Sequence, residues 1–357
     1  MRIHIRKCLG ALSAIPLFAL SSMLGAQSYS VIDIGALPGD NIIATRINQA
    51  GQGIGQSGKM YGVQTHAFVL SGGKVVDIGT LPGGEYSSAS DVNTKGTVVG
   101  EANTDTNIHA FIWDEKGGLQ DIGTLPTDTG SRAFGISDSD QVVGYSSGAH
   151  PPIAFLWMKS QGMTSLGTLP GGDTSEAYGI NNPGTVVGVA STQFGVKHAF
   201  VWTAKDGMKD IGTLPGDITS EARKISTTGI VIGSSFGTNV THAFMWTAAG
   251  GMQDIGSLNG DSTSPLDINN KGEIVGTSAA SMSGHAFYWS GATGIKDLND
   301  LIPADSGVIL TSATTINNAG LILALGAVTT DKSQPLQLDN THHHAGPIHA
   351  FLLKPVS

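Results

Sequence analysis

Residues 77–113 read DIGTLPGGEYSSASDVNTKGTVVGEANTDTNIHAFIW, and versions of this stretch recur along most of the chain. The D-I-G triplet that opens it, or a close variant, occurs seven times, beginning at Asp33, Asp77, Asp121, Ser165, Asp210, Asp254 and Asp297. Successive copies are 44, 44, 44, 45, 44 and 43 residues apart. A fixed period of this length is typical of a repeat architecture, so motifs made of repeated residues are first explained as structure.

Each period contains four short runs with the composition of β-strands. In the second unit these are Ala89–Val92, Thr97–Gly100, His109–Trp113 and Leu119–Ile122. The turn after the first run is N-x-x-G, here Asn93–Gly96, in which Asn starts the turn and Gly ends it with a positive φ. Four strands in about 44 residues correspond to one propeller blade.

The two ends of the repeat region are complementary. Residues 29–35 match the fourth strand of a unit, and residues 349–353 match a third strand that has no fourth strand after it. Pairing them closes a ring without open edges, so we expect an all-β, seven-bladed β-propeller whose N-terminal strand completes the last blade. An open β-solenoid is the alternative. The blades are expected near residues 44–81, 88–125, 132–169, 176–214, 221–258, 264–301 and 312–353 plus 29–37.

The N-terminus, residues 1–26, has the features of a secretory signal peptide: a basic start followed by the apolar stretch Leu9–Leu24. Cys8, the only cysteine, falls inside it, which excludes disulfides and thiol catalysis in residues 27–357. Removing the three basic residues of this segment from the total of 19 leaves 16 against 28 acidic residues, a net charge of −12. We therefore expect a secreted or periplasmic monomer without nucleic acid as a partner and without a membrane span.

The H-A-F triplet, together with D-I-G-T-L-P-G-G and I-N-x-x-G, resembles the HAF-repeat family of probable extracellular bacterial proteins. The resemblance covers residues 29–357 and implies export and a repeat fold, but no catalytic motif. The histidines of the triplet are expected to bond to an Asp or to the backbone of their own blade. They are His66, His109, His198, His242, His285 and His349, with Ile153-Ala154-Phe155 as the degenerate copy. The tryptophans that follow are expected to pack between blades.

The loops between blades and the loops between second and third strands share one face of a propeller, here called the top face. One acid occurs in every inter-blade loop: Asp40, Glu85, Asp128, Asp173, Asp217, Asp261 and Asp305. Of these, Asp40, Asp173, Asp217 and Asp261 are the predicted metal ligands, because carboxylates around one mouth attract cations and suit Ca²⁺. The alternative is that each acid closes its own turn. No organic cofactor is predicted.

Two insertions break the repeat symmetry, and both are expected on the top face. The inter-blade loop Leu298–Ser312 is longer than its counterparts, and the loop Leu325–Ile348 has 24 residues where the others have 8–10. Long irregular loops in compact domains are often functional. The second loop contains His342, His343 and His344, which are candidate metal ligands or catalytic bases; the alternative is a solvated loop.

One position of the first strand varies in charge from unit to unit. It holds Arg46, Asp91, Gly135, Gly179, Lys224, Asp267 and Thr315. A purely structural position of a repeat stays uniform, so Arg46, Asp91, Lys224 and Asp267 are predicted to line a solvated channel.

These features predict an exported propeller that binds a small molecule, a glycan, an extracellular partner or a divalent cation on its top face. The alternative is a Ca²⁺-dependent hydrolase of lactones or esters, by analogy with secreted propellers that hold an axial calcium. The cation would polarise the carbonyl, and a loop histidine would direct water. A carbohydrate-binding surface ranks lower, because the top loops contain few aromatic residues, mainly Tyr86, Phe194 and Phe236.

Overall fold

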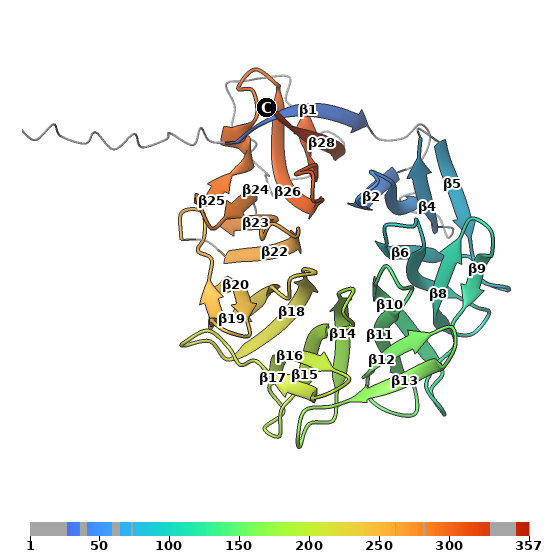
Figure 1. Ribbon diagram of the computed structural model, residues 1–357. Coiled ribbons are helices and arrows are strands. Elements are labelled where there is room, and N and C mark those ends of the chain that lie inside the picture. The colour runs from blue at the N-terminus through green and yellow to red at the C-terminus, as the bar shows by residue number, and fades with distance from the viewer. Residues whose placement is uncertain are drawn as a thin grey trace, which may run out of the picture.

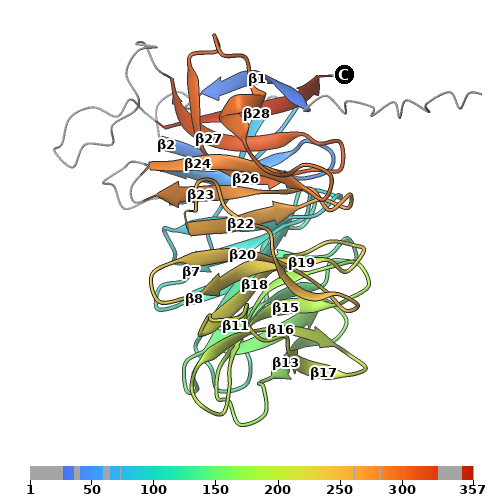
Figure 2. The same cartoon turned by 90° about the vertical axis from the view of Figure 1, so that its left-hand side faces the viewer.

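The computed structural model describes residues 27–35, 41–58, 65–72, 74–260, 262–280, 283–328 and 348–356. Seven four-stranded antiparallel sheets stand around a common axis, which confirms the predicted seven-bladed β-propeller (Figure 1). Turned by 90°, the ring is seen edge-on, with the strands running across its thickness (Figure 2).

Six blades are built from consecutive strands, named here from the axis outward. Blade 1 is β2 (Asn41–Ile47), β3 (Gly53–Gly58), β4 (Thr65–Ser71) and β5 (Lys74–Gly79), and blade 2 is β6 (Ser87–Val92), β7 (Val98–Asn103), β8 (Ile108–Asp114) and β9 (Gly118–Asp121). Blade 3 is β10 (Gly130–Ile136), β11 (Val142–Ser147), β12 (Ile153–Met158) and β13 (Gly162–Gly167), and blade 4 is β14 (Ser175–Ile180), β15 (Val186–Ser191), β16 (Lys197–Thr203) and β17 (Gly207–Asp210). Blade 5 is β18 (Thr219–Ile225), β19 (Val231–Phe236), β20 (Thr241–Thr247) and β21 (Gly251–Asp254), and blade 6 is β22 (Ser262–Ile268), β23 (Ile274–Ala280), β24 (Ser283–Ser290) and β25 (Gly294–Asp297).

Blade 7 joins the two ends of the repeat region. From the axis outward it contains β26 (Val308–Ile316), β27 (Ile322–Val328), β28 (His349–Val356) and β1 (Ser28–Gly35). Strand β1 pairs antiparallel with β28 from Ser28↔Val356 to Gly35↔Ala350, which confirms closure by the N-terminal strand. The inner strands β2, β6, β10, β14, β18, β22 and β26 surround the axis (Figure 1).

The phenylalanine of the H-A-F triplet is a large, fully buried side chain in every blade. These residues are Phe68, Phe111, Phe155, Phe200, Phe244, Phe287 and Phe351. Phe200 of blade 4, for example, clusters with Val143 and Leu156 of blade 3, and Trp202 packs against the same cluster. Each such ring stabilises the fold by roughly 1.5–3 kcal/mol relative to an exposed one. The inter-blade packing predicted for the tryptophans is confirmed here.

The H-A-F histidine ties the third strand to the fourth. In five blades its Nδ1 lies within hydrogen-bond distance of the D-I-G aspartate, as in His109 and Asp121, 2.7 Å apart, which confirms the structural role predicted for it. His242 differs, because its Nδ1 lies 3.0 Å from Asp217 of the preceding inter-blade loop.

Strand boundaries differ slightly from those expected, and one insertion contains a helical turn. The inner strand of blade 2 begins at Ser87 rather than at Ala89, because Ser87 already pairs with Ala102. In the insertion before blade 7, Leu298–Leu301 forms a 3₁₀ helix whose two leucines are buried. Part of this insertion therefore serves the core and not the top face. In the described ranges, no helix is long and apolar enough to cross a membrane.

The glycine of the V-V-G sequence permits a close approach between the first and second strands. A Cβ built on Gly144 lies 1.8 Å from the carbonyl oxygen of Arg132, which is backbone and has no freedom to move away. We expect Gly144→Ala to destabilise the fold by about 2 kcal/mol or more, since overpacking forces a backbone shift. Chemical denaturation measures this effect.

Gly291 provides the matched control, because a Cβ there meets no atom within 4 Å. Gly291→Ala is expected to change the free energy of unfolding by less than about 0.5 kcal/mol. Equal stability of the two variants would contradict the close approach.

Candidate functional site

A polar cavity of about 220 Å³ lies on the axis, at the end of the channel formed by the N-x-x-G turns. Its walls are the last residues of the inner strands and the first residues of the turns that follow them. This end is the turn face, opposite to the top face on which a site was expected. All four side chains predicted to line the channel contribute to the cavity: Arg46, Asp91, Lys224 and Asp267.

These four side chains form an alternating set of charges. The ammonium of Lys224 lies 3.2 Å from the carboxylate of Asp91. The guanidinium of Arg46 lies between the two acids, with Nε 3.8 Å from Asp91 and Nη1 3.8 Å from Asp267. The side chains are mostly buried, with exposed fractions of 13–21%. Charges in such a place interact more strongly than they do in water.

Both carboxylates are held by the neighbouring blade. Asp91 accepts a hydrogen bond from the backbone N–H of Ile136, at 3.3 Å. Asp267 accepts one from the N–H of Ile316, at 3.0 Å, and one from the hydroxyl of Thr315, at 2.6 Å. The acids therefore keep fixed positions with or without a ligand.

The cations have fewer partners than the acids. In the described part of the chain, the guanidinium of Arg46 makes no hydrogen bond, since its two ion-pair distances of 3.8 Å exceed hydrogen-bond length. Its five N–H donors are thus available on the wall of the cavity. Burial, and next the charge of Arg46, lowers the pKa of Lys224, although Asp91 and Asp267 oppose this shift.

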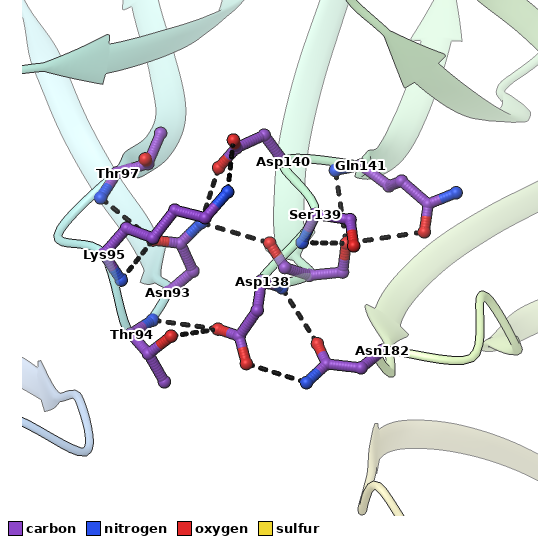
Figure 3. Close-up of polar contacts among 10 residues, drawn as sticks. Asn93, Thr94, Lys95, Thr97, Asp138, Ser139, Asp140, Gln141 and Asn182 are labelled. Atoms are coloured by element: carbon purple, nitrogen blue, oxygen red, sulfur yellow. Dashed lines mark hydrogen bonds and ion pairs between the residues drawn. The ribbon is translucent and has the colours of Figure 1, made fainter.

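A ring of turn residues forms the mouth of the cavity. Its members follow the first residue of each turn: Gln49, Thr94, Asp138, Asn182, Thr227, Asn270 and Asn318. The side chain of one member accepts a hydrogen bond from the backbone N–H of the member before it. Figure 3 shows two such links, Thr94 to Asp138 at 3.0 Å and Asp138 to Asn182 at 2.9 Å. We call this set the turn ring.

Three further links continue the turn ring. Thr227 donates to Asn270, Asn270 to Asn318 and Asn318 to Gln49, at 2.8–3.1 Å. The last of them joins blade 7 to blade 1. In the described residues, no such bond joins Gln49 to Thr94 or Asn182 to Thr227. At both places the accepting side chain would be a threonine, which is shorter than Asn, Gln or Asp. The mouth is therefore rigid and lined by amides, hydroxyls and the carboxylate of Asp138.

The asparagine that opens four of the turns makes a second, buried set of inter-blade bonds. The amide of Asn93 donates to the backbone carbonyl of Ser137 and to the carboxylate of Asp140, while its oxygen accepts from the N–H groups of Lys95 and Thr97 (Figure 3). Asn48, Asn181 and Asn269 bond to the next blade in the same way. The N-x-x-G turn thus shapes its own blade and also locks it to the next one.

The predicted top-face metal ligands are not brought together in the described ranges. Asp173 accepts a hydrogen bond from Ser191 at 2.9 Å, and Asp217 lies against His242 with only 3% of its side chain exposed. Each acid thus closes a loop near its own blade. No group of three or more His, Asp or Glu in these ranges is placed to hold a metal ion.

The other predicted metal ligands and catalytic bases lie in parts of the chain that the structure does not describe. Asp40, Asp261 and the histidines His342, His343 and His344 lie outside the described residues. The calcium site therefore stays a prediction. The turn ring was not predicted, although its signal is present in the sequence as a polar residue after the first residue of every turn.

No family model and no curated protein matches the chain. Among solved structures, oligogalacturonate lyase from Vibrio parahaemolyticus is similar in fold, with a TM-score of 0.55 at 9% identity over 92% of this chain and 97% of the other. A prolyl endopeptidase structure gives a TM-score of 0.54 at 9% identity over 82% of this chain. The likeness shows the propeller fold alone.

This chain spans 47% to 61% of the length of several of the solved chains that it matches. A gluconolactonase from Xanthomonas campestris also matches, at 10% identity over 73% of this chain and 83% of the other, with a TM-score of 0.38. A similarity this low carries no argument about activity. The comparisons therefore establish a β-propeller and leave the function to the geometry of the axial cavity.

Proposed function

We propose that this protein is an exported HAF-repeat propeller that binds a small monocarboxylate in its axial cavity and does not act as an enzyme. The observation that supports it best is the guanidinium of Arg46. It is mostly buried, makes no hydrogen bond in the described part of the chain and lies on the wall of a polar cavity. Its N–H donors are open to the cavity and can bond to the oxygens of a ligand.

The chemistry of Arg46 favours a carboxylate over other polar groups. A guanidinium presents two parallel N–H donors whose spacing matches the two oxygens of a carboxylate. Asp91 and Asp267 flank it at equal distances and are fixed by their own bonds, so Arg46 is positioned before a ligand arrives. Lys224 supplies a second positive charge in the same cavity.

Charge and size limit the ligand further. The cavity lining has two cations, Arg46 and Lys224, and three acids, Asp91, Asp138 and Asp267, so each added negative charge is uncompensated and a monoanion is preferred to a dianion. A volume of about 220 Å³ corresponds to roughly seven water molecules at ~30 Å³ each. The amides of the turn ring are placed to bond to a hydroxyl or amino group next to the carboxylate.

The hydrolase alternative stays a prediction, because the residues it requires are either outside the described ranges or bonded near their own blade, as Asp173 and Asp217 are. The hydrolase alternative predicts a different experimental result from the binding proposal. A metal-dependent hydrolase turns over lactones or esters with added calcium and loses this activity with a chelator.

The proposed ligand class is tested by thermal denaturation with acetate, lactate, glycine and malonate, each against sodium chloride of equal ionic strength. A ligand at 100 times its Kd stabilises the fold by about 2.7 kcal/mol. We expect at least one monocarboxylate to raise the midpoint by about 2 °C or more. Malonate, a dianion, is expected to act more weakly. No shift with any monocarboxylate, or a larger shift with malonate, would contradict the proposal.

A further inference from the structure

Every inner strand has a β-bulge at the same place. At this place the pairing with the second strand skips one residue in each blade, for example between Ala133 and Gly135 in β10, and β26 has a second skip between Leu310 and Ser312. The skipped residues, here called the bulge ring, are Thr45, Ser90, Phe134, Tyr178, Arg223, Leu266 and Thr314. Bulges re-aim side chains and are common beside binding sites.

The bulge ring has two unlike sides. On blades 3–5, planar groups pack in a row: the rings of Phe134 and Tyr178 meet edge-to-face with their centroids 5.5 Å apart, and the guanidinium of Arg223 lies 5.9 Å from the centre of the Tyr178 ring. Tyr145 extends this row, 5.8 Å from Phe134. Aromatic and cation–π contacts at these distances are favourable.

Outside blades 3–5 the ring has three small hydroxyl residues and one leucine, Leu266 of blade 6. The hydroxyls of Thr45 and Thr314 donate back to the carbonyls of their own blades. Ser90 is the third small member. Blades 7 and 1 lie across the axis from blade 4 (Figure 1), so the two threonines and the aromatic row belong to opposite sides of the propeller.

The same asymmetry is found two residues earlier along the inner strands. Blades 3–5 have Arg132, Glu176 and Glu221 there, whereas blades 2, 6 and 7 have serine. Tyr178 donates to Glu176 at 2.8 Å, and burial, followed by the charge of Glu176, raises the pKa of Tyr178. Its hydroxyl therefore stays protonated as a donor at neutral pH.

The acids of this wall are paired with cations. Arg132 pairs with Glu101, Lys197 with Glu176 and Arg223 with Glu221, so that three acids and three cations cancel in charge. Half of the Arg223 side chain is exposed, and the three glutamates are 12–18% exposed. Polar groups of both kinds are thus reachable from solvent beside the aromatic row.

The repeat itself indicates that this variation is not required for packing. One position separates the bulge residue from the variable residue two places before it. It is proline in blade 6 and alanine in the other six blades: Ala44, Ala89, Ala133, Ala177, Ala222, Pro265 and Ala313. A fold that keeps this position uniform has no structural need for aromatic and charged side chains on three neighbouring blades only. Symmetry broken along one wall is expected of a binding site for a small asymmetric molecule.

We propose that the wall formed by Phe134, Tyr178, Arg223 and the flanking glutamates binds a neutral sugar ring. The aromatic faces match the apolar C–H face of such a ring, and the carboxylates and guanidinium groups match its hydroxyls. Balanced charges favour an uncharged ligand over an acidic one. The site is separate from the axial cavity, because none of its residues line that cavity.

The test is a calorimetric titration of the protein with maltose, cellobiose and di-N-acetylchitobiose, with glucuronate as the acidic comparison. We expect at least one disaccharide to bind with a Kd of about 1 mM or below and Phe134→Ala to weaken it about tenfold or more. The exposed Phe194 is the matched control, and Phe194→Ala is expected to bind within about twofold of the parent.

Two further variants separate the contribution of the aromatic ring to sugar binding from that of the hydroxyl and from the axial cavity. Tyr178→Phe keeps the ring and removes the hydroxyl bond to Glu176, so it is expected to bind less tightly while remaining folded. Arg46→Gln is expected to leave sugar binding unchanged, which separates this site from the carboxylate cavity. The proposal is overturned if no disaccharide binds below 20 mM, if glucuronate binds to Arg46→Gln more tightly than all of the disaccharides do, or if Phe134→Ala binds like the parent.

Discussion

Deletion of residues 27–35 is expected to abolish cooperative folding at 37 °C or to lower the unfolding midpoint by about 10 °C or more. This segment contains β1, the outer strand of blade 7. Its loss removes Tyr29, which is 1% exposed and packs edge-on against Tyr288, and exposes the whole edge of β28. A buried aromatic side chain alone is worth about 3–5 kcal/mol, and an uncovered edge strand promotes aggregation.

The measurement is thermal denaturation followed by circular dichroism, together with size-exclusion chromatography. Adding a peptide of residues 27–35 to the truncated chain is expected to restore the monomer peak, whereas the same peptide with Tyr29→Ala is not. A truncated chain that unfolds at the parent's midpoint would show that β1 is not needed to close the ring.

Asn93→Ala is expected to lower the free energy of unfolding by about 3 kcal/mol or more. The side chain is 4% exposed and takes part in four hydrogen bonds, two within its turn and two to blade 3. Alanine removes all four and leaves the N–H of Thr97 and the carbonyl of Ser137 buried without this partner. Each unsatisfied buried group costs about 1–3 kcal/mol.

Asn182 is the matched control for this prediction. It is also a turn asparagine bonded to Asp138, but it is exposed, so water replaces its partner when it is removed. The free energy of unfolding of both variants is measured by urea titration, and Asn182→Ala is expected to cost less than about 1 kcal/mol. If the two substitutions have the same cost, the buried inter-blade bond is not what stabilises the ring.

The sequence predicts the fold well because the same physical constraints repeat seven times. The period, the N-x-x-G turns and the complementary ends predicted a closed ring, and the pairing of β1 with β28 confirms it. Boundaries were less accurate. The inner strands begin earlier than hydrophobic patterning indicates, since Ser87 pairs with β7 through its backbone whatever its side chain.

Site residues were predictable only where they break the repeat. The mixed charges at Arg46, Asp91, Lys224 and Asp267 were noticed in this way, and the structure places them around one cavity. Phe134 and Tyr178 stand one position earlier and show the same irregularity, but the bulge that makes that position special depends on strand pairing. Periodicity alone does not reveal a register shift.

The partner of a side chain was the hardest feature to predict. His242 occupies the same place in its repeat as His198, yet it lies against the inter-blade Asp217 and not against the D-I-G aspartate of its own blade. The choice depends on the loop geometry around each acid. The charge of the inter-blade acids suggested a shared cation, whereas Asp173 and Asp217 each use their carboxylate to close a local loop.

The most direct measurement is a calorimetric titration of the protein and of Arg46→Gln with the monocarboxylate that gives the largest thermal shift, with Arg223→Gln as the control. Arg46→Gln keeps a polar side chain in the cavity and removes the charged fork. We expect it to weaken binding about tenfold or more, since a charge-assisted bidentate contact is lost, while Arg223→Gln binds like the parent. Equal affinity of the parent and Arg46→Gln would contradict a carboxylate site in the axial cavity.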